Sequence, residues 1–181
     1  MHISGSSGDI AEVNELKQLT TRAIVEYRPA YISYSRGKAF IATVDDAGAT
    51  AGEYTIWLKN DSETPIVINT IFTANVSANV VWALHKTTGT GGTAPAITPI
   101  NLNLSSGNDA NVTCLGGAGG VSDLTSAGII TTWGGGVAYF NATINWWLEA
   151  LILGKNDAIA LEYDAGTSAR ATASIMFHDY A

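Results

Sequence analysis

The stretch that decides the fold is EYTIWLKNDSETPIVINTIF, Glu53 to Phe72, in which two apolar segments flank one polar turn. Its first segment alternates. We expect one strand face to carry Tyr54, Ile56 and Leu58, and the other to carry Thr55, Trp57 and Lys59. Asn60, Asp61 and Ser62 are residue types that bond their own backbone in turns, and Pro65 cannot donate to a ladder. The stretch therefore predicts a β-hairpin whose second strand begins near Pro65.

Alternation with a period of two continues on both sides of this stretch. Upstream, it predicts strands at Thr21–Tyr27, Tyr31–Tyr34 and Lys38–Val44, followed by a turn at Asp45–Gly52. Downstream, Asn79–His85 is expected to place Val80, Trp82 and Leu84 on one face and to end before Gly89, Gly91 and Gly92. Further strands are expected at Gly128–Trp133 and Val137–Ile144, broken by Gly134–Gly136.

The last piece, Lys155–Tyr180, has the pattern of a second hairpin with a turn at Asp164–Ser168. Its two apolar sets are expected to face one core: Ile159, Leu161 and Tyr163 outbound, and Ala171, Ala173, Ile175 and Phe177 on the return. Many short strands with little helix predict an all-β protein, as a single jelly-roll-like β-sandwich over residues 21–181. Residues 1–20 are weakly amphipathic and are expected to form an N-terminal arm, either extended or as a short helix.

Two segments stand apart from this pattern. Residues 87–128 are rich in Gly, Thr, Asn and Pro, and are expected to be a long loop with one or two short strands. A loop of that length in a compact domain is expected to pack on something and to offer a working surface, although a plain surface loop fits equally. WWLEALIL, Trp146–Leu153, is apolar on both faces, which predicts a fully covered strand in the sandwich or at a subunit contact, with a helix as the alternative.

Composition narrows the class of protein. The chain has 181 residues, of which 14% are charged, and a net charge of −7. A surface of small neutral polar residues suits an assembled particle or an extracellular domain better than a cytosolic enzyme. The acidic total argues against nucleic acid as a partner. Charge is uneven, because residues 1–38 hold five basic and four acidic residues, whereas the other 143 hold four and twelve.

Targeting signals are not expected either. The opening MHISGSSGDIAEVNEL lacks the cationic start and apolar core of a signal peptide. Leu124–Leu148 carries no charge, yet its glycine, threonine and asparagine residues argue against a bilayer span. Cys114 is the only cysteine, so no intrachain disulfide forms, and we expect it to be a buried, inert residue.

The search for reactive groups predicts no catalytic, cofactor-binding or metal-binding residues and therefore no enzyme. His2, His85 and His178 have no His or Cys at ligand spacing, and a Ser-His-Asp triad built on His85 or His178 would lack a G-x-S-x-G elbow. The glycine clusters are expected to be tight turns, because no Lys-Ser or Lys-Thr follows them. Asp45 with Asp46, and Asp61 with Glu63, lack calcium-loop spacing and are expected to be solvated turn carboxylates.

Two chemistries stay open at this point. Carboxylates that hydrolyse glycosides meet only in the fold. Tryptophans that stack on sugar rings are equally compatible with the sequence, although core packing is expected for each of Trp57, Trp82, Trp133, Trp146 and Trp147. The Asn-x-Ser/Thr sequences reflect the abundance of Asn and Thr.

Three blocks resemble a family of small tailed-bacteriophage virion proteins. They are IWLKNDSETPIVINTI, then TPINLNLSSGNDANVT, and finally LGKNDAIALEYDAGTSARATASIMFHDY, and the resemblance spans approximately residues 20–180. It implies β-sandwich proteins of the capsid decoration (cement) or head and tail fibre type, usually trimeric, with an N-terminal segment that holds the shell. These motifs are structural, so the resemblance implies no catalytic residue.

The leading hypothesis is a homotrimeric capsid decoration protein that binds the major capsid protein on the outer surface of the phage head and stabilises the head. The protein is expected to be made in the host cytoplasm. No cofactor and no nucleic acid or membrane partner is expected. Capsid docking is predicted for Arg22, Arg28, Arg36 and Lys38. A subunit interface is predicted for Trp146, Trp147 and Leu148. The alternatives are a receptor- or carbohydrate-binding fibre module, with a surface glycan as partner, and a hydrolase domain.

Overall fold

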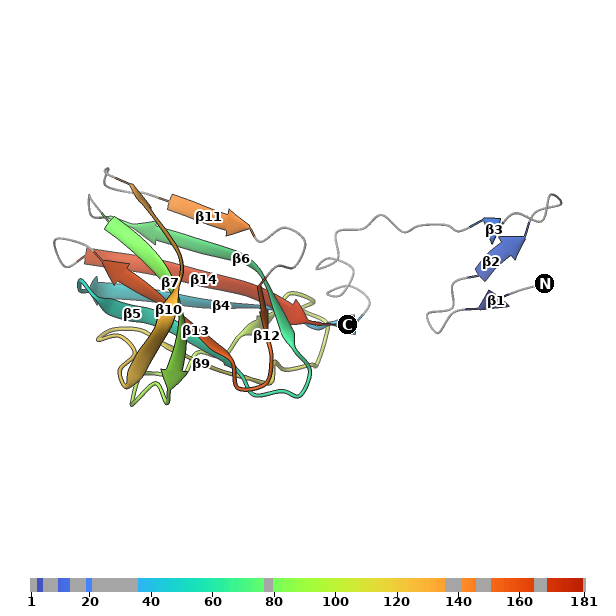
Figure 1. Ribbon diagram of the computed structural model, residues 1–181, viewed down its shortest axis with the longest axis horizontal. Helices are drawn as coiled ribbons and strands as arrows, with labels where there is room; N and C mark the ends of the chain where they lie inside the picture. Colours follow the sequence, from blue (N-terminus) through green and yellow to red (C-terminus); the bar gives the residue numbers. More distant parts are fainter. Residues whose placement is uncertain are drawn as a thin grey trace.

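Two antiparallel sheets packed face to face form a sandwich from residue 39 to residue 179 (Figure 1). The structure is a computed structural model, and it describes residues 3–4, 10–13, 19–20, 36–76, 80–135, 141–145, 151–164 and 169–180. The sandwich strands are β4 (Ala39–Ala49), β5 (Glu53–Asn60), β6 (Ile66–Asn75), β7 (Val80–Gly89), β8 (Ile100–Asn101), β9 (Val112–Gly116), β10 (Leu124–Gly135), β11 (Asn141–Asn145), β12 (Leu151–Leu153), β13 (Ala158–Asp164) and β14 (Ala169–Asp179).

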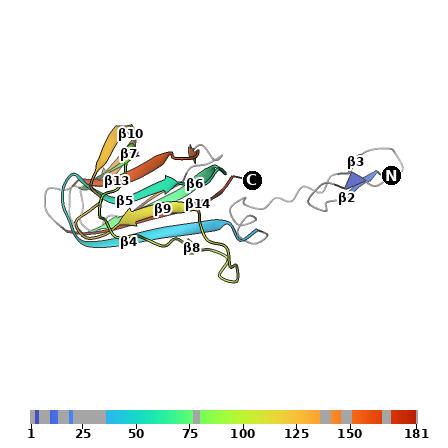
Figure 2. The ribbon, with the colours of Figure 1, turned by 90° about the horizontal axis from the view of Figure 1, so that it is seen from below.

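The strand order is that of a jelly roll. One sheet runs β10-β7-β13-β5-β9, and the other runs β11-β6-β14-β4-β8, with β12 also paired to β6. Without the short strands β8, β9 and β12, eight strands of the sandwich remain. In chain order, the first, eighth, third and sixth of them (β4, β14, β6 and β11) form one sheet. The second, seventh, fourth and fifth (β5, β13, β7 and β10) form the other. Two Greek keys wrapped in this way define the jelly roll. In Figure 2, β10, β7 and β13 lie on the upper side of the sandwich and β4 and β8 on the lower. The predicted all-β, jelly-roll-like sandwich is therefore confirmed.

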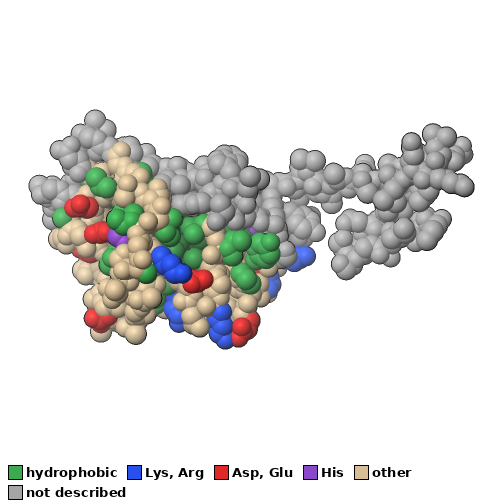
Figure 3. Space-filling view, viewed as in Figure 1, with side chains coloured by type: hydrophobic (Ala, Val, Ile, Leu, Met, Phe, Trp, Pro, Cys, Tyr) green, Lys and Arg blue, Asp and Glu red, His purple; other side chains and the backbone are tan. Residues whose placement is uncertain are grey.

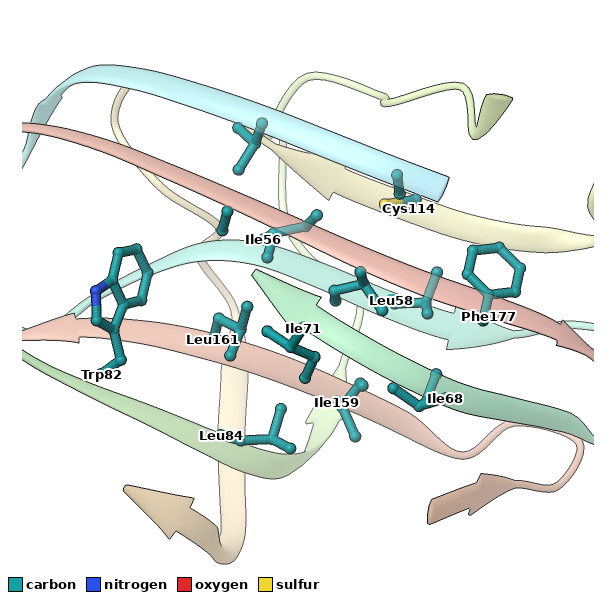
Figure 4. Packing of buried hydrophobic residues seen from close by; sticks show 14 of the residues in the cluster. Ile56, Leu58, Ile68, Ile71, Trp82, Leu84, Cys114, Ile159, Leu161 and Phe177 are labelled. Atoms are coloured by element: carbon teal, nitrogen blue, oxygen red, sulfur yellow. The ribbon is translucent and has the colours of Figure 1, made fainter. Parts of the chain in front are cut away.

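The core lies between the sheets and follows the predicted alternation. Val80, Trp82 and Leu84 point inward from β7 and are fully buried. The seven predicted core residues of the last segment, from Ile159 to Phe177, are also buried in this cluster, which Figure 4 shows in close-up. Each aliphatic side chain buried in this way contributes about 1.5–3 kcal/mol of transfer free energy.

Both predicted hairpins are wrong in their pairing. β5 and β6 belong to different sheets, and so do β13 and β14, because each connection crosses from one sheet to the other. Alternation specifies which face of a strand is apolar, but it does not specify the partner strand. β5 pairs with β13 and β9, and β6 pairs with β14, β11 and β12.

The predicted assignment of side chains to the two faces of β5 is wrong at Tyr54, because the strand contains a β-bulge. Ile56 pairs with Leu161 and Tyr54 pairs with Glu162, so Thr55 is the extra residue on β5. Ile56 then points into the core as expected, whereas Tyr54 lies on the outer face with Trp57. One added residue reverses the side to which every following side chain points.

Residues 87–128 are built into the fold as expected. They contribute β8, which pairs with β4, and β9, which pairs with β5. Leu115 and Val121 from this segment cover Trp57 on the outer face of β5 and form a second apolar cluster with Ala158 and Ala160. Cys114 is buried as predicted, and burial raises the pKa of its thiol to about 12.

Other boundaries differ from the expected ones. β4 continues to Ala49, so the turn predicted from Asp45 is confined to residues 50–52, and β10 continues to Gly135. Within residues 1–20 the described strands β1 (Ile3–Ser4), β2 (Ile10–Val13) and β3 (Leu19–Thr20) form a small antiparallel sheet, in keeping with the extended alternative for the arm. The strands predicted at Thr21–Tyr27 and Tyr31–Tyr34 lie outside the described residues. The described part of the chain contains no helix that is long and apolar enough to cross a bilayer.

Candidate functional site

The junction between residues 1–35 and the sandwich is held by the segment NLNLSSGN, Asn101 to Asn108. Asn101 donates its side-chain N–H to the carbonyl of Gly37 at 2.6 Å and to the carbonyl of Asn108 at 2.9 Å. Asn108 donates to the carbonyl of Arg36 at 2.9 Å, and the Ser106 hydroxyl donates to Gly37 at 3.3 Å. We call Asn101, Ser106 and Asn108 the junction latch. It fixes the place where the chain enters β4.

The latch is preorganised by its own backbone. The side-chain oxygen of Asn101 accepts the N–H of Asn103, whose side-chain oxygen accepts the N–H of Ser105, and the Ser106 hydroxyl accepts the N–H of Asn108. Side chains of this kind that bond the backbone two residues ahead hold a loop in a fixed series of turns. These local hydrogen bonds therefore hold the loop in the conformation that contacts residues 36 and 37.

Gly37 is required by this arrangement. Its φ is +59°, and a Cβ atom there would lie 2.2 Å from Oγ of Ser106. Substituting Gly37→Ala is expected to lower the free energy of unfolding by about 1–3 kcal/mol, because the left-handed backbone is strained for alanine and Ser106 must move.

The measurement is chemical denaturation of Gly37→Ala beside Gly107→Ala. Gly107 lies in the same loop, with nothing within 4 Å of its added Cβ. The control is expected to stay within about 0.5 kcal/mol of wild type. Equal stability of the two variants would show that the latch does not hold Gly37.

An apolar strip lies beside the latch. Ile100, Leu102 and Leu104 alternate with Asn101 and Asn103, and they are 60%, 39% and 85% exposed. Grouped apolar side chains at a surface mark sites of interaction. Figure 3 shows one face of the molecule, on which tan surface from other side chains and backbone surrounds several green apolar patches. The strip is thus a candidate contact surface at the end of the sandwich that carries the junction.

The predicted docking residues are only partly described. Arg36 is exposed, with its carbonyl held by the latch. Lys38 donates to Asp179 at 3.0 Å, so its charge is partly matched by β14. Arg22 and Arg28 lie outside the described residues. The structure therefore brings Arg36 and Lys38 to the junction and leaves the other two untested.

The predicted subunit interface lies between β11 and β12 in the sequence. Trp146, Trp147 and Leu148 are outside the described residues. The end of the same segment forms β12, which pairs with β6 as a strand, with Leu153 buried. Ile152 is 44% exposed, so full coverage of this strand does not hold within the single chain.

A polar network around the buried His85 is the strongest reactive constellation among the described residues of the sandwich. Nδ1 of His85 lies 2.8 Å from Oγ of Ser126, and Nε2 lies 2.6 Å from Oε2 of Glu162. Tyr54 packs edge-on to the imidazole, and burial, followed by the charge of Glu162, raises the pKa of its phenol. Bulges at Ser126/Gly128 and Leu161/Glu162 lie beside two of these residues.

The network has the residue types of a hydrolytic triad in another arrangement. The hydroxyl contacts Nδ1 rather than Nε2, and it already accepts the N–H of Gly128 at 3.2 Å. With this hydroxyl donating to Nδ1, the remaining ring proton lies on Nε2, facing Glu162. The arrangement ties β10 to β7 and β13. In the core, Nδ1 of His178 lies 2.6 Å from Oδ1 of Asn69.

The fold leaves few of the described tryptophan side chains exposed for stacking on a sugar ring. Trp57 and Trp82 are buried, which confirms core packing for both. Trp133 is half-buried and donates to the Thr73 hydroxyl at 2.9 Å. Among the described residues, no group of three or more His, Cys, Asp or Glu side chains gathers as metal ligands.

Comparisons with known proteins add little to this geometry. The chain matches none of the protein-family models, and none of the curated proteins matches its sequence. Among solved structures it is similar to a mutant VP2 protein of infectious bursal disease virus, from derived T=1 particles, at 13% identity and with a TM-score of 0.15. The match covers 94% of this chain and 44% of that chain, so this chain spans less than half the length of VP2. A TM-score of this size does not indicate a shared fold.

Proposed function

We propose that this chain is a structural protein of a bacteriophage particle, a decoration protein that binds the outer surface of the head and stabilises it. The observation that carries the proposal is the junction latch. It holds residues 36 and 37, where the chain enters β4, at one defined point beside the apolar strip of Ile100, Leu102 and Leu104. A fixed entry point next to exposed apolar side chains suits a protein that docks on a shell through this end.

The charge distribution supports the same orientation. Residues 1–38 are slightly basic, whereas the remaining residues carry the acidic excess. The basic end would face the major capsid protein, and the acidic sandwich would face solvent and resist aggregation of decorated particles. Binding across neighbouring shell subunits stabilises the assembled state, because the ligand binds that state alone.

The resemblance motifs also gain a physical meaning in this fold. The asparagines of NLNLSSGN make the latch, and Asn60 in IWLKNDSETPIVINTI holds the crossing between the sheets through bonds to the carbonyls of Thr64 and Leu153. Both blocks build the scaffold that carries the N-terminal segment. A homotrimer remains part of the proposal, and its test is the mass of the purified protein in solution.

Deleting residues 1–20 is expected to abolish binding to assembled heads while leaving the folded trimer, because docking resides in the N-terminal segment. The measurement is co-sedimentation with heads that lack this protein, together with the solution mass. A chain in which residues 1–20 are scrambled at constant composition separates sequence from charge, and it too is expected to lose binding. Undiminished binding by the deletion would reject docking through the arm.

The location itself is tested by imaging purified particles by cryo-EM. Density for the jelly roll on the exterior of the head is the expected result. Particles without this chain, or with it only on tail fibres, would overturn the decoration role.

A further inference from the structure

His85 is a buried side chain whose contacts reach the surface. Asp46, His85 and His178 are the acidic or imidazole side chains buried among the described residues. The expectation that Asp46 is a solvated turn carboxylate is wrong, because β4 continues past it and carries it inward. His178 lies against Asn69 in the core. His85 differs from both, since its Nδ1 contacts the hydroxyl of the exposed residue Ser126. A hydroxyl in contact with a neighbouring base is the arrangement that activates a nucleophile.

The position of Ser126 depends on a β-bulge in β10. Ser126 pairs with Thr87 and Gly128 pairs with Lys86, so Ala127 is the extra residue. Bulges re-aim side chains and are frequent beside active sites. In many hydrolases a sharp G-x-S-x-G turn displays the serine, and this sequence has no such turn. The bulge provides another way to hold an exposed serine hydroxyl against a buried imidazole.

The imidazole of His85 has the contacts of a general base. Nδ1 lies 2.8 Å from Oγ of Ser126, and Nε2 lies 2.6 Å from Oε2 of Glu162. When the hydroxyl donates to Nδ1, the ring proton lies on Nε2 and faces the carboxylate. Transfer of the serine proton to Nδ1 forms an imidazolium, which the Glu162 carboxylate stabilises. Either nitrogen of a neutral imidazole can act as the base, so the contact through Nδ1 preserves this function.

Two hydrogen-bonding groups surround the serine oxygen. The N–H of Gly128 donates to Oγ of Ser126 at 3.2 Å. The phenol of Tyr54 also hydrogen-bonds with Ser126, and its ring packs edge-on to His85 with centroids 5.4 Å apart. Burial, followed by the charge of Glu162, raises the pKa of this phenol, so it keeps its proton and can donate. Donors placed beside the reacting oxygen stabilise the negative charge that develops during acyl transfer.

The solvent side of Ser126 is open. Ala127 and Gly128 are exposed, and a Cβ added at Gly128 would meet nothing within 4 Å. Ile129, which is 61% exposed, offers an apolar contact close by on the same strand. The space therefore admits a small acyl group whose leaving group remains in solvent.

We propose that Ser126 is a nucleophile and that this network hydrolyses small carboxylic esters, with His85 as the general base and Glu162 as a positioning residue. Oγ attacks the carbonyl carbon while its proton moves to Nδ1. The bond to the leaving alcohol then breaks, and the alcohol takes this proton. Water attacks the acyl-serine, a water proton returns through His85 to Oγ, and the carboxylic acid is released. This activity departs from the sequence-based expectation of no enzyme.

The experiment treats the full chain with p-nitrophenyl acetate and, separately, with a fluorophosphonate probe. Wild-type protein is expected to release p-nitrophenolate over many turnovers and to gain one probe, which peptide mass spectrometry locates on Ser126. Ser126→Ala is expected to lose the label and to lower turnover at least about 100-fold, as is His85→Gln, because general-base catalysis contributes about 10²–10⁴-fold. Thr125→Ala is the matched control, since it removes an exposed hydroxyl one residue away. It is expected to react as wild type does.

Glu162→Gln separates positioning from a purely structural role. It is expected to lower kcat about 10-fold or more while KM stays unchanged, because the carboxylate acts on the imidazolium of the transition state. A structural role alone would change Tm and leave kcat as it is. Ser126→Ala is expected to fold, because the side chain is exposed, and its Tm checks this.

Two outcomes would overturn the proposal. The first is wild-type protein on which the probe does not label Ser126. The second is folded Ser126→Ala that hydrolyses p-nitrophenyl acetate as fast as wild type. These measurements use isolated protein, so their result is independent of binding to heads.

Discussion

Replacing Trp82 with Ala is expected to lower the free energy of unfolding by about 3–5 kcal/mol, the cost of a large cavity in a closed core. The indole is fully buried in the core cluster (Figure 4). It packs edge-on to Tyr163, with ring centroids 5.2 Å apart. Its N–H also reaches across the sandwich to the side-chain oxygen of Asn75 at 3.5 Å. For a protein of this size the loss corresponds to a fall in Tm of about 10 °C.

The matched control is Val81→Ala, because Val81 is the next residue on β7 and is 43% exposed on the other face. It is expected to stay within about 0.5 kcal/mol of wild type. Comparable destabilisation of both variants would mean that the register of β7 is wrong, since a slip of one residue exchanges the two faces. The pair also tests the sugar-binding alternative, in which Trp82 would affect binding rather than folding.

Replacing Asn60 with Ala is expected to cost about 2–4 kcal/mol, although the side chain is small and polar. The buried amide donates to the carbonyls of Thr64 and Leu153 at 3.0 Å each, and its oxygen accepts the N–H of Ser62 at 2.9 Å. The substitution leaves two carbonyls and one N–H without partners at the crossing from β5 to β6.

Two further variants sharpen this test. Asn60→Asp keeps the acceptor and the shape but replaces both donated hydrogens with a carboxylate that faces carbonyls, so it is expected to be at least as destabilising as alanine. Asn111→Ala removes an exposed side chain and is the neutral control. Chemical denaturation measures all three. If Asn60→Ala matches Asn111→Ala, the amide does not hold the crossing.

The sequence predicts the faces of strands well, because burial is recorded locally in the alternation. Val80, Trp82 and Leu84 lie on the core side, and so do Ile159 and Phe177. It fails on pairing, which is decided by residues distant in the chain: β5 reaches β13, and β4 reaches β14 through contacts such as that between the hydroxyls of Thr43 and Ser174. Alternation also cannot reveal a bulge, and so the outward turn of Tyr54 was missed.

The candidate site was predicted only in outline. The sequence predicts that residues 87–128 pack on something, but it does not predict the latch. The carbonyls of Arg36 and Gly37 that Asn101 and Asn108 contact lie more than 60 residues upstream. The burial of Asp46 depends on β4 continuing past the expected turn, for which the sequence around Ala47 and Gly48 offers no local signal. Charged residues at turns are usually solvated, and only the register shows that this one is not.

The place of β14 has a consequence for synthesis. This strand lies between β4 and β6 in the middle of its sheet, yet residues 169–179 follow both of them far along the sequence. Until residues 169–179 emerge, β4 and β6 have no partner between them, and their unpaired edges are open to other chains. This sheet is therefore expected to form only once residues 169–179 have been made, at the slow rate typical of chains whose contacts are remote in sequence. Removal of β14 would divide the sheet.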